Sequence, residues 1–161
     1  MADVDGMKSL LACALLLLAA SSLRAADLPY DEKADAKADV HQALTRAVGS
    51  HHSVLVVFGA NWCPDCRVLD ATVKQGQTAE LVGKNFEVVK VDLGRYDKNV
   101  DLATSYGVDV KKGIPTVALL SARGEVVYVT KSSELADARH MGDDGILRFF
   151  QKLVADHPPQ P

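Results

Sequence analysis

Two cysteines three residues apart are the side chains of this sequence best suited to chemistry. They belong to the run Trp62-Cys63-Pro64-Asp65-Cys66, which lies between an apolar run, 53–59, and a segment of helical character, 67–74. If Cys66 lies one turn into that helix, both sulfurs share one helix face and can form a disulfide. Pro64 suits the first helical position, because the N–H that it lacks would have no partner there. The spacing predicts a redox-active pair at a strand-to-helix junction.

The two thiols are expected to have different tasks. Free amides and the dipole of the helix start stabilise a thiolate on Cys63 and lower its pKa below the free-thiol value of about 8.5. Cys66, deeper in the helix, is shielded and is expected to resolve the mixed disulfide that Cys63 forms with a partner. Pro64 and Asp65 tune the pair, and an ionised Asp65 disfavours the thiolate. We therefore expect a reducing or intermediate potential.

Two other uses of the pair are less favoured. A structural zinc site needs four ligands, and no second pair of cysteines or of suitably spaced histidines exists after the N-terminal segment. A purely structural disulfide would close a very short loop and stabilise the fold by only ~2 kcal/mol. No metal site is predicted.

Length and charge limit the remaining classes of function. The chain has 161 residues, enough for one ordinary domain with a short appendage. Its net charge is −3, with acids and bases interspersed, so no nucleic-acid surface is indicated. Small molecules, proteins and thiols stay open as partners, and we expect a monomer.

The N-terminal segment has the composition of a secretory signal peptide. Lys8 precedes an apolar run, 10–20, that is too short for a membrane span of about 20 residues. We expect a signal peptide over residues 1–26 with cleavage near Ala25 or Ala26; a lipid anchor on Cys13 and an uncleaved anchor are the alternatives. Export would place the protein in the periplasm or another extracytoplasmic space, where paired cysteines can be oxidised.

Hydrophobic periodicity predicts alternating helices and strands after this segment. Residues 26–33 are expected to be an unstructured lead-in, and an apolar stripe including Val48 predicts a helix from about Asp35 to Gly49. The helix after the cysteines is expected to run to about Gln75. Further strands are predicted at 86–92, 116–120 and 125–129, and further helices at 78–84, at 100–106 and from Asp143 or Asp144 onward. The last helix is expected to bury its apolar positions: Ile146, Leu147, Phe150, Leu153 and Val154.

This order predicts an α/β fold with a central four-stranded mixed sheet flanked by helices on both faces. Residues 27–157 would form the domain and residues 158–161 a flexible tail. The last two strands are separated by a four-residue turn that contains glycine, which is typical of a hairpin.

The sequence resembles the thioredoxin family. The matching residues are the run 60–66, the strand ahead of it, and Gly113-Ile114-Pro115-Thr116, and the resemblance extends over roughly 34–154. It implies a thioredoxin-like fold in which Pro115 is a cis-proline beside the sulfurs. It also implies that the backbone of Ile114 pairs with an extended substrate segment and that Trp62 flanks the groove. Such a protein needs no cofactor beyond the Cys63–Cys66 pair and takes electrons from another dithiol protein, for which a membrane-embedded donor is one candidate.

The departures from the family pattern concern the proton of Cys66. Thioredoxins commonly carry a buried aspartate six residues before the first cysteine, and here that residue is Val57. Water, Asp65 or another group would then serve Cys66. Lys90 matches a lysine that usually accompanies the aspartate, and we interpret it as a strand residue whose ammonium group reaches solvent. Residues 139–141 are interpreted as ordinary loop residues rather than contacts of the active-site rim.

The sequence therefore predicts a thiol–disulfide oxidoreductase that acts on protein disulfides as a reductase or isomerase-type donor. One alternative is a binding or assembly module in which the pair is a sensor or is dispensable. Another alternative is a disulfide-forming oxidase.

Overall fold

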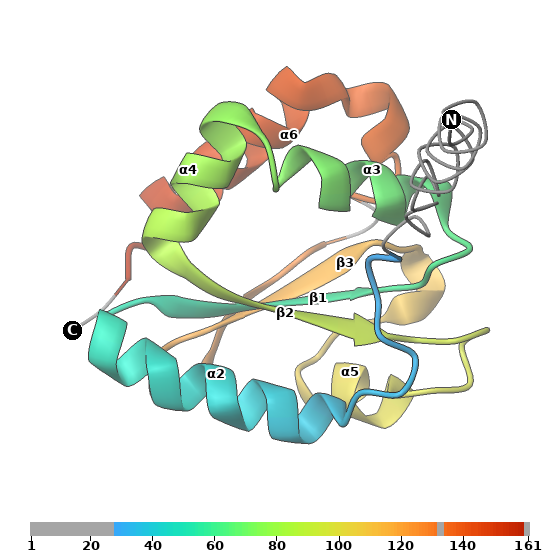
Figure 1. Ribbon diagram of the computed structural model, residues 1–161, viewed down its shortest axis with the longest axis horizontal. Coiled ribbons are helices and arrows are strands. Elements are labelled where there is room, and N and C mark those ends of the chain that lie inside the picture. The colour runs from blue at the N-terminus through green and yellow to red at the C-terminus, as the bar shows by residue number, and fades with distance from the viewer. Residues whose placement is uncertain (1–27, 132–133, 160–161) are drawn as a thin grey trace, which may run out of the picture.

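The computed structural model describes residues 28–131 and 134–159. A central sheet separates two layers of helices, as Figure 1 shows. The predicted signal peptide lies outside the described residues, as do the last two residues of the predicted tail. Within the described ranges, no helix has the length and apolar character needed to cross a membrane.

The sheet has four strands in the order β2-β1-β3-β4. The strands are β1 (Ser53–Gly59), β2 (Phe86–Asp92), β3 (Thr116–Leu120) and β4 (Val126–Val129). β1 pairs with β2 in parallel and with β3 antiparallel, and β3 pairs with β4 antiparallel. All residues of β1 and β3 are buried, as expected of central strands that are covered on both faces. The predicted α/β fold with a mixed four-stranded sheet is confirmed.

Helices cover both faces of this sheet. In Figure 1, α2 and α5 lie on one side, and α3, α4 and α6 lie on the other. Their bounds are α2 (Ala36–Ser50), α3 (Pro64–Thr72), α4 (Gly76–Asn85), α5 (Val100–Ser105) and α6 (Ala138–Asp156), and a 3₁₀ turn covers Val110–Lys112. Asp35 caps α2 by accepting a hydrogen bond from the Ala38 N–H, which satisfies one of the free amides at the helix start.

Several helix boundaries differ from the prediction. The helix after the cysteines ends at Thr72, and α4 begins at Gly76, the residue expected to break the previous helix. α6 begins at Ala138 and bends at Gly142, whose φ of 65° is not helical. Because the bend interrupts the apolar periodicity, the sequence shows only the part of α6 that follows it.

Some apolar positions are also less buried than predicted. Val48 is 63% exposed, so only part of the predicted stripe of α2 faces the sheet. In α6, Leu147 and Val154 are half-buried, whereas Ile146 and Phe150 are fully buried.

The lead-in before α2 is anchored to the domain, contrary to the prediction that it is unstructured. Tyr30 is only 2% exposed. Its backbone N–H donates to Asn61 Oδ1 at 3.0 Å, and Asn61 Nδ2 donates to the Tyr30 carbonyl at 2.9 Å. This pair of hydrogen bonds holds the lead-in beside the loop that carries the cysteines.

Candidate active site

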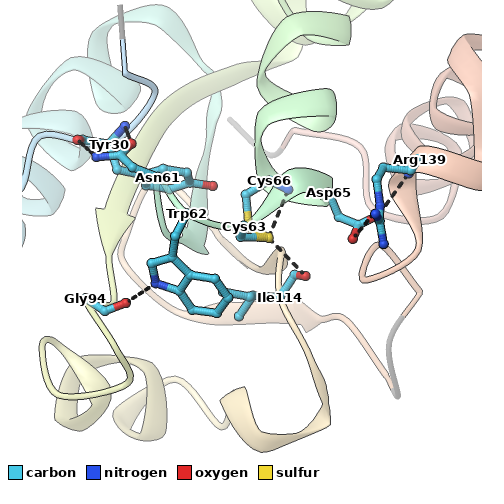
Figure 2. Close-up of a disulfide and its surroundings, with 9 residues drawn as sticks. All are labelled: Tyr30, Asn61, Trp62, Cys63, Asp65, Cys66, Gly94, Ile114 and Arg139. Carbon is cyan, nitrogen blue, oxygen red and sulfur yellow. Dashed lines mark hydrogen bonds and ion pairs between the residues drawn. A yellow bond between two sulfur atoms is a disulfide. The ribbon is translucent and has the colours of Figure 1, made fainter.

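The two cysteines lie at the start of α3 and form a disulfide (Figure 2). Their Cα atoms are 5.3 Å apart, within the usual range for a disulfide. Cys63 is the N-cap residue, and its sulfur accepts a hydrogen bond from the Cys66 backbone N–H at 3.1 Å. The amide that a helix leaves free at its first turn therefore points at the Cys63 sulfur.

Local sequence explains why the sulfurs lie here. β1 ends at Gly59, and the Cys63 N–H donates to the Ala60 carbonyl at 3.1 Å, which turns the chain toward α3. Pro64 occupies the first turn of the helix, where its ring is tolerated. Both cysteines are shielded, with exposed fractions of 3% for Cys63 and 0% for Cys66.

The Ile114–Pro115 segment lies against the cysteines, although 51 residues separate Cys63 from Ile114. The Ile114 carbonyl oxygen is 3.6 Å from the Cys63 sulfur, and the Ile114–Pro115 peptide bond is cis. The structure thus brings together the two segments on which the family resemblance depends.

Trp62 is an exposed side chain of the motif, with 42% of its surface accessible. Its Nε1–H donates to the Gly94 carbonyl at 2.6 Å, as Figure 2 shows. The Arg95 guanidinium carbon lies 5.3 Å from the ring centroid, and the Tyr96 ring meets it edge-on at 5.8 Å. Trp62 therefore lies beside the disulfide in a fixed orientation, supported by the loop after β2.

Asp65 has a partner that the sequence analysis did not foresee. The Arg139 backbone N–H donates to Asp65 Oδ1 at 3.0 Å, and Arg139 Nε lies 3.2 Å from each carboxylate oxygen. In Figure 2 the carboxylate turns away from the sulfurs and toward Arg139. The interpretation of Arg139 as an ordinary loop residue is wrong. The negative charge between the cysteines is offset by a guanidinium group.

Lys90 lies on β2 with its side chain 27% exposed, and it also has a partner that its interpretation as a strand residue did not include. Its Nζ forms an ion pair with Asp70 Oδ1, and Lys74 Nζ lies 2.8 Å from Asp70 Oδ2. Val57 is buried, as predicted for a strand residue. Asp70 follows Cys66 by four residues, which places both on one face of α3. That spacing is the sequence signal that could have identified Asp70 as a carboxylate on the same helix face as Cys66.

The part of the chain that the structure describes holds no candidate metal centre. Among residues 28–131 and 134–159, no group of three or more potential ligands comes together. Cys13 is not part of the described ranges. Within those ranges, the cysteine pair is the redox-capable group of this site.

Comparison with known proteins identifies the family. Residues 35–122 match a family model described as thioredoxin-like. The chain belongs to the thioredoxin-like family. This confirms the resemblance inferred from the cysteine motif and the Ile114–Pro115 segment.

Individual relatives agree with this assignment. The crystal structure of a disulphide isomerase from Xylella fastidiosa Temecula1 is 47% identical, with a TM-score of 0.78, and the match covers 81% of this chain and 99% of that one. A thioredoxin from Griffithsia pacifica is 36% identical over 45% of this chain, and human nucleoredoxin is 32% identical over 49%. The chain spans only 59% and 22% of the lengths of these two relatives.

Proposed function

We propose that this protein is a thiol–disulfide oxidoreductase that exchanges electrons between its Cys63–Cys66 pair and the disulfides of other proteins. Cys63 is the attacking thiol and Cys66 the resolving thiol. The observation that carries the proposal is the hydrogen bond from the Cys66 backbone N–H to the Cys63 sulfur. A donor aimed at this sulfur favours its ionised form, and the thiolate is the nucleophile in disulfide exchange.

The reaction proceeds in two exchanges. In the first, the Cys63 thiolate attacks a substrate disulfide, and one substrate sulfur leaves while the other stays bonded to Cys63. In the second, Cys66 attacks the Cys63 sulfur, the bond to the substrate breaks, and the Cys63–Cys66 disulfide forms. The substrate gains two electrons and the pair loses two, so a second dithiol protein must return the pair to its reduced form.

Substrate binds along the edge formed by Trp62, Ile114 and Pro115. The Ile114 carbonyl lies beside the Cys63 sulfur and can pair with the main chain of an extended substrate segment, as in other forms of strand addition. The exposed face of Trp62 adds an apolar contact next to the disulfide. Side-chain sequence contributes little to such main-chain recognition, which suits a protein that acts on many partners.

The role as a reductase or isomerase-type donor is supported by the relative of 47% identity, which is named as a disulphide isomerase. Both roles require the reduced pair as the working form. We place this activity in the periplasm or another extracytoplasmic space, consistent with the composition of residues 1–26. The protein works as a monomer and needs no cofactor beyond the cysteine pair.

The proposal is tested by trapping. In a Cys66→Ser variant, Cys63 should accumulate as mixed disulfides with protein partners, which non-reducing electrophoresis and mass spectrometry identify. A Cys63→Ser, Cys66→Ser double variant is the matched control. The purified wild-type protein should reduce insulin with dithiothreitol as donor or refold scrambled ribonuclease, and both activities should be lost in the double variant. Retained biological activity in the double variant would instead indicate a binding module.

A further inference from the structure

The sulfur of Cys66 is enclosed, and this raises the question of where its proton goes. Cys66 has an exposed fraction of 0%. Burial disfavours a thiolate, yet the resolving step requires one. Two groups that could have helped are unsuited: Val57 is apolar, and the Asp65 carboxylate turns away from the sulfurs toward Arg139 (Figure 2). The proton must leave through another polar group.

The Tyr30 hydroxyl lies close to this sulfur. A Cβ atom built on Gly59 would overlap this hydroxyl and would lie 3.0 Å from the Cys66 sulfur. The hydroxyl and the sulfur therefore lie against the same point of β1. Figure 2 shows the Tyr30 ring extending toward Cys66. Tyr30 is almost fully buried, with an exposed fraction of 2%.

Tyr30 also lines a small cavity of about 20 Å³. Asp70 from α3 and Lys90 from β2 line the same cavity, and its other lining residues are apolar. A volume of this size can hold one water molecule, which needs two to four polar partners. Tyr30, Asp70 and Lys90 are the lining residues whose side chains carry polar groups. The Lys90 side chain is 27% exposed, so one of the lining residues reaches solvent.

The charges around Tyr30 make its hydroxyl a donor. Burial raises the pKa of Tyr30 well above its ordinary value, and the negative charges of Asp70 and Asp92 raise it further. The phenol therefore keeps its proton at neutral pH and can donate to an anion. The positive charges nearby belong to Lys90 and Lys74, both paired with Asp70, and to Lys98, which lies 3.4 Å from Asp92.

We propose that Tyr30 handles the proton of Cys66: its hydroxyl donates a hydrogen bond to the Cys66 thiolate, and one water molecule in the cavity carries the thiol's proton past Asp70 and Lys90 to solvent. This inference rests on the proposed function, because only a dithiol that resolves mixed disulfides needs to ionise Cys66. It assigns a role to the lead-in, which is joined to the cysteine loop through Asn61.

The step balances without a further reactant. Cys66 loses its proton to the water, and its thiolate attacks the Cys63 sulfur of the mixed disulfide. The Cys63–Cys66 bond forms, and the bond between Cys63 and the partner breaks. The partner's sulfur leaves with the bonding electron pair and is protonated by solvent. Tyr30 keeps its own proton overall and stabilises the anion while it exists.

The resolving step can be observed with Ellman's reagent. For this assay the full chain is prepared with the substitution Cys13→Ser and is then reduced, so that Cys63 and Cys66 are its only thiols. Attack of Cys63 releases one thionitrobenzoate, and attack of Cys66 on the resulting mixed disulfide releases a second. Stopped-flow absorbance records both phases from pH 5 to pH 9. A Cys66→Ser variant identifies the first phase, since it lacks the second.

Tyr30→Phe keeps the ring and removes the hydroxyl. We expect an unchanged first phase, a second phase about tenfold slower at pH 7, and a pH profile of that phase shifted upward by about one unit. Tyr106→Phe, which removes the hydroxyl of a partly buried tyrosine, should leave both phases unchanged. A second phase in Tyr30→Phe with the wild-type rate and pH profile overturns the inference, as does equal slowing of both phases.

Asp70→Asn separates proton transfer from simple electrostatics. Removal of a nearby negative charge would by itself stabilise the Cys66 thiolate and speed the second phase at pH 7. Loss of the charged partner of the water slows that phase by about tenfold instead. Asp101→Asn is the control, because Asp101 is an exposed carboxylate paired with Lys37. A faster second phase in Asp70→Asn overturns the inference, even if Tyr30→Phe fails to fold. Absence of a second phase in the parent chain refutes the proposed function itself.

Discussion

Arg139→Met gives the most direct test of how the fold supports the cysteine motif. The substitution keeps a long side chain and removes the guanidinium that faces Asp65. Two contacts of 3.2 Å are lost, whereas the hydrogen bond from the Arg139 backbone N–H at 3.0 Å can persist. The Asp65 carboxylate then stays between the cysteines with its charge no longer offset.

The expected loss of stability follows from burial. The Asp65 side chain is 9% exposed and that of Arg139 is 50% exposed. Breaking a fully buried pair costs about 3–5 kcal/mol, whereas exposed pairs contribute about 0–1 kcal/mol. With one partner half in solvent and one hydrogen bond retained, we expect unfolding to become easier by about 1–2 kcal/mol. For a chain of this size that corresponds to a melting temperature lower by ~3–6 °C.

The reduction potential should fall as well. An uncompensated Asp65 charge at the start of α3 disfavours the Cys63 thiolate and therefore the reduced pair. An exposed ion pair contributes about 0.7 kcal/mol, and a loss of that size lowers the reduction potential by about 15 mV. Equilibration with glutathione, followed by alkylation and mass spectrometry, measures this shift. Guanidinium unfolding of the oxidised protein measures the stability.

The control is Arg148→Met, in which an exposed arginine of the same helix is replaced. The Asp65→Asn, Arg139→Met double variant tests whether the two effects depend on each other. The double variant should lose less unfolding free energy than the two single variants lose together. In the double variant residue 65 is a neutral amide, so removal of the guanidinium leaves no unpaired buried charge. If Arg139→Met and Arg148→Met unfold at the same denaturant concentration and have the same potential, the assigned role of the ion pair is refuted.

Three further predictions concern the surroundings of the pair. Gly59→Ala should lower the free energy of unfolding by ~1–3 kcal/mol in chemical denaturation, because the added methyl overlaps the Tyr30 hydroxyl; wild-type stability would contradict this close packing. Trp62→Phe removes the hydrogen bond to the Gly94 carbonyl and should speed hydrogen exchange of the backbone amides in residues 93–99, while the amides of β1 stay protected. If residues 93–99 are protected equally in the variant and in the wild-type protein, this hydrogen bond does not order the loop. Burial raises the pKa of Tyr30 and of Tyr128 above the ordinary value of about 10, so the folded state keeps protons that the unfolded state loses, and stability should fall as the pH rises above about 10. Tyr30→Phe should reduce that alkaline loss, and an unaltered pH dependence would argue against the burial of its phenol.

Apolar runs along the chain predicted the sheet, because β1 and β3 are almost entirely apolar and the run of β2 is interrupted only by Glu87 and Lys90. β1 and β2 begin and end at the predicted residues, since each run is bounded by polar or glycine residues. The start of α6 was missed because Gly142 bends the helix and no apolar stripe crosses the bend. Val48 was placed in the core because periodicity identifies a face of a helix but not the width of the surface that covers it.

By itself, the sequence determined the reactive pair and its setting. The spacing of Cys63 and Cys66 puts two sulfurs on one turn of helix, and Pro64 and the preceding strand specify where that turn begins. These are local properties, carried by residues close together in the chain, so they can be recognised without coordinates.

The tertiary structure decided which other side chains serve that pair. Arg139 contacts Asp65 across 74 residues, and Lys90 reaches Asp70 across 20. Tyr30 is brought to Cys66 from a segment whose composition predicts no structure. Such contacts depend on how helices and strands pack, and spacing along the chain carries no information about them. One short run of residues therefore specifies the chemistry of the disulfide, whereas its charge balance and its proton route arise only on folding.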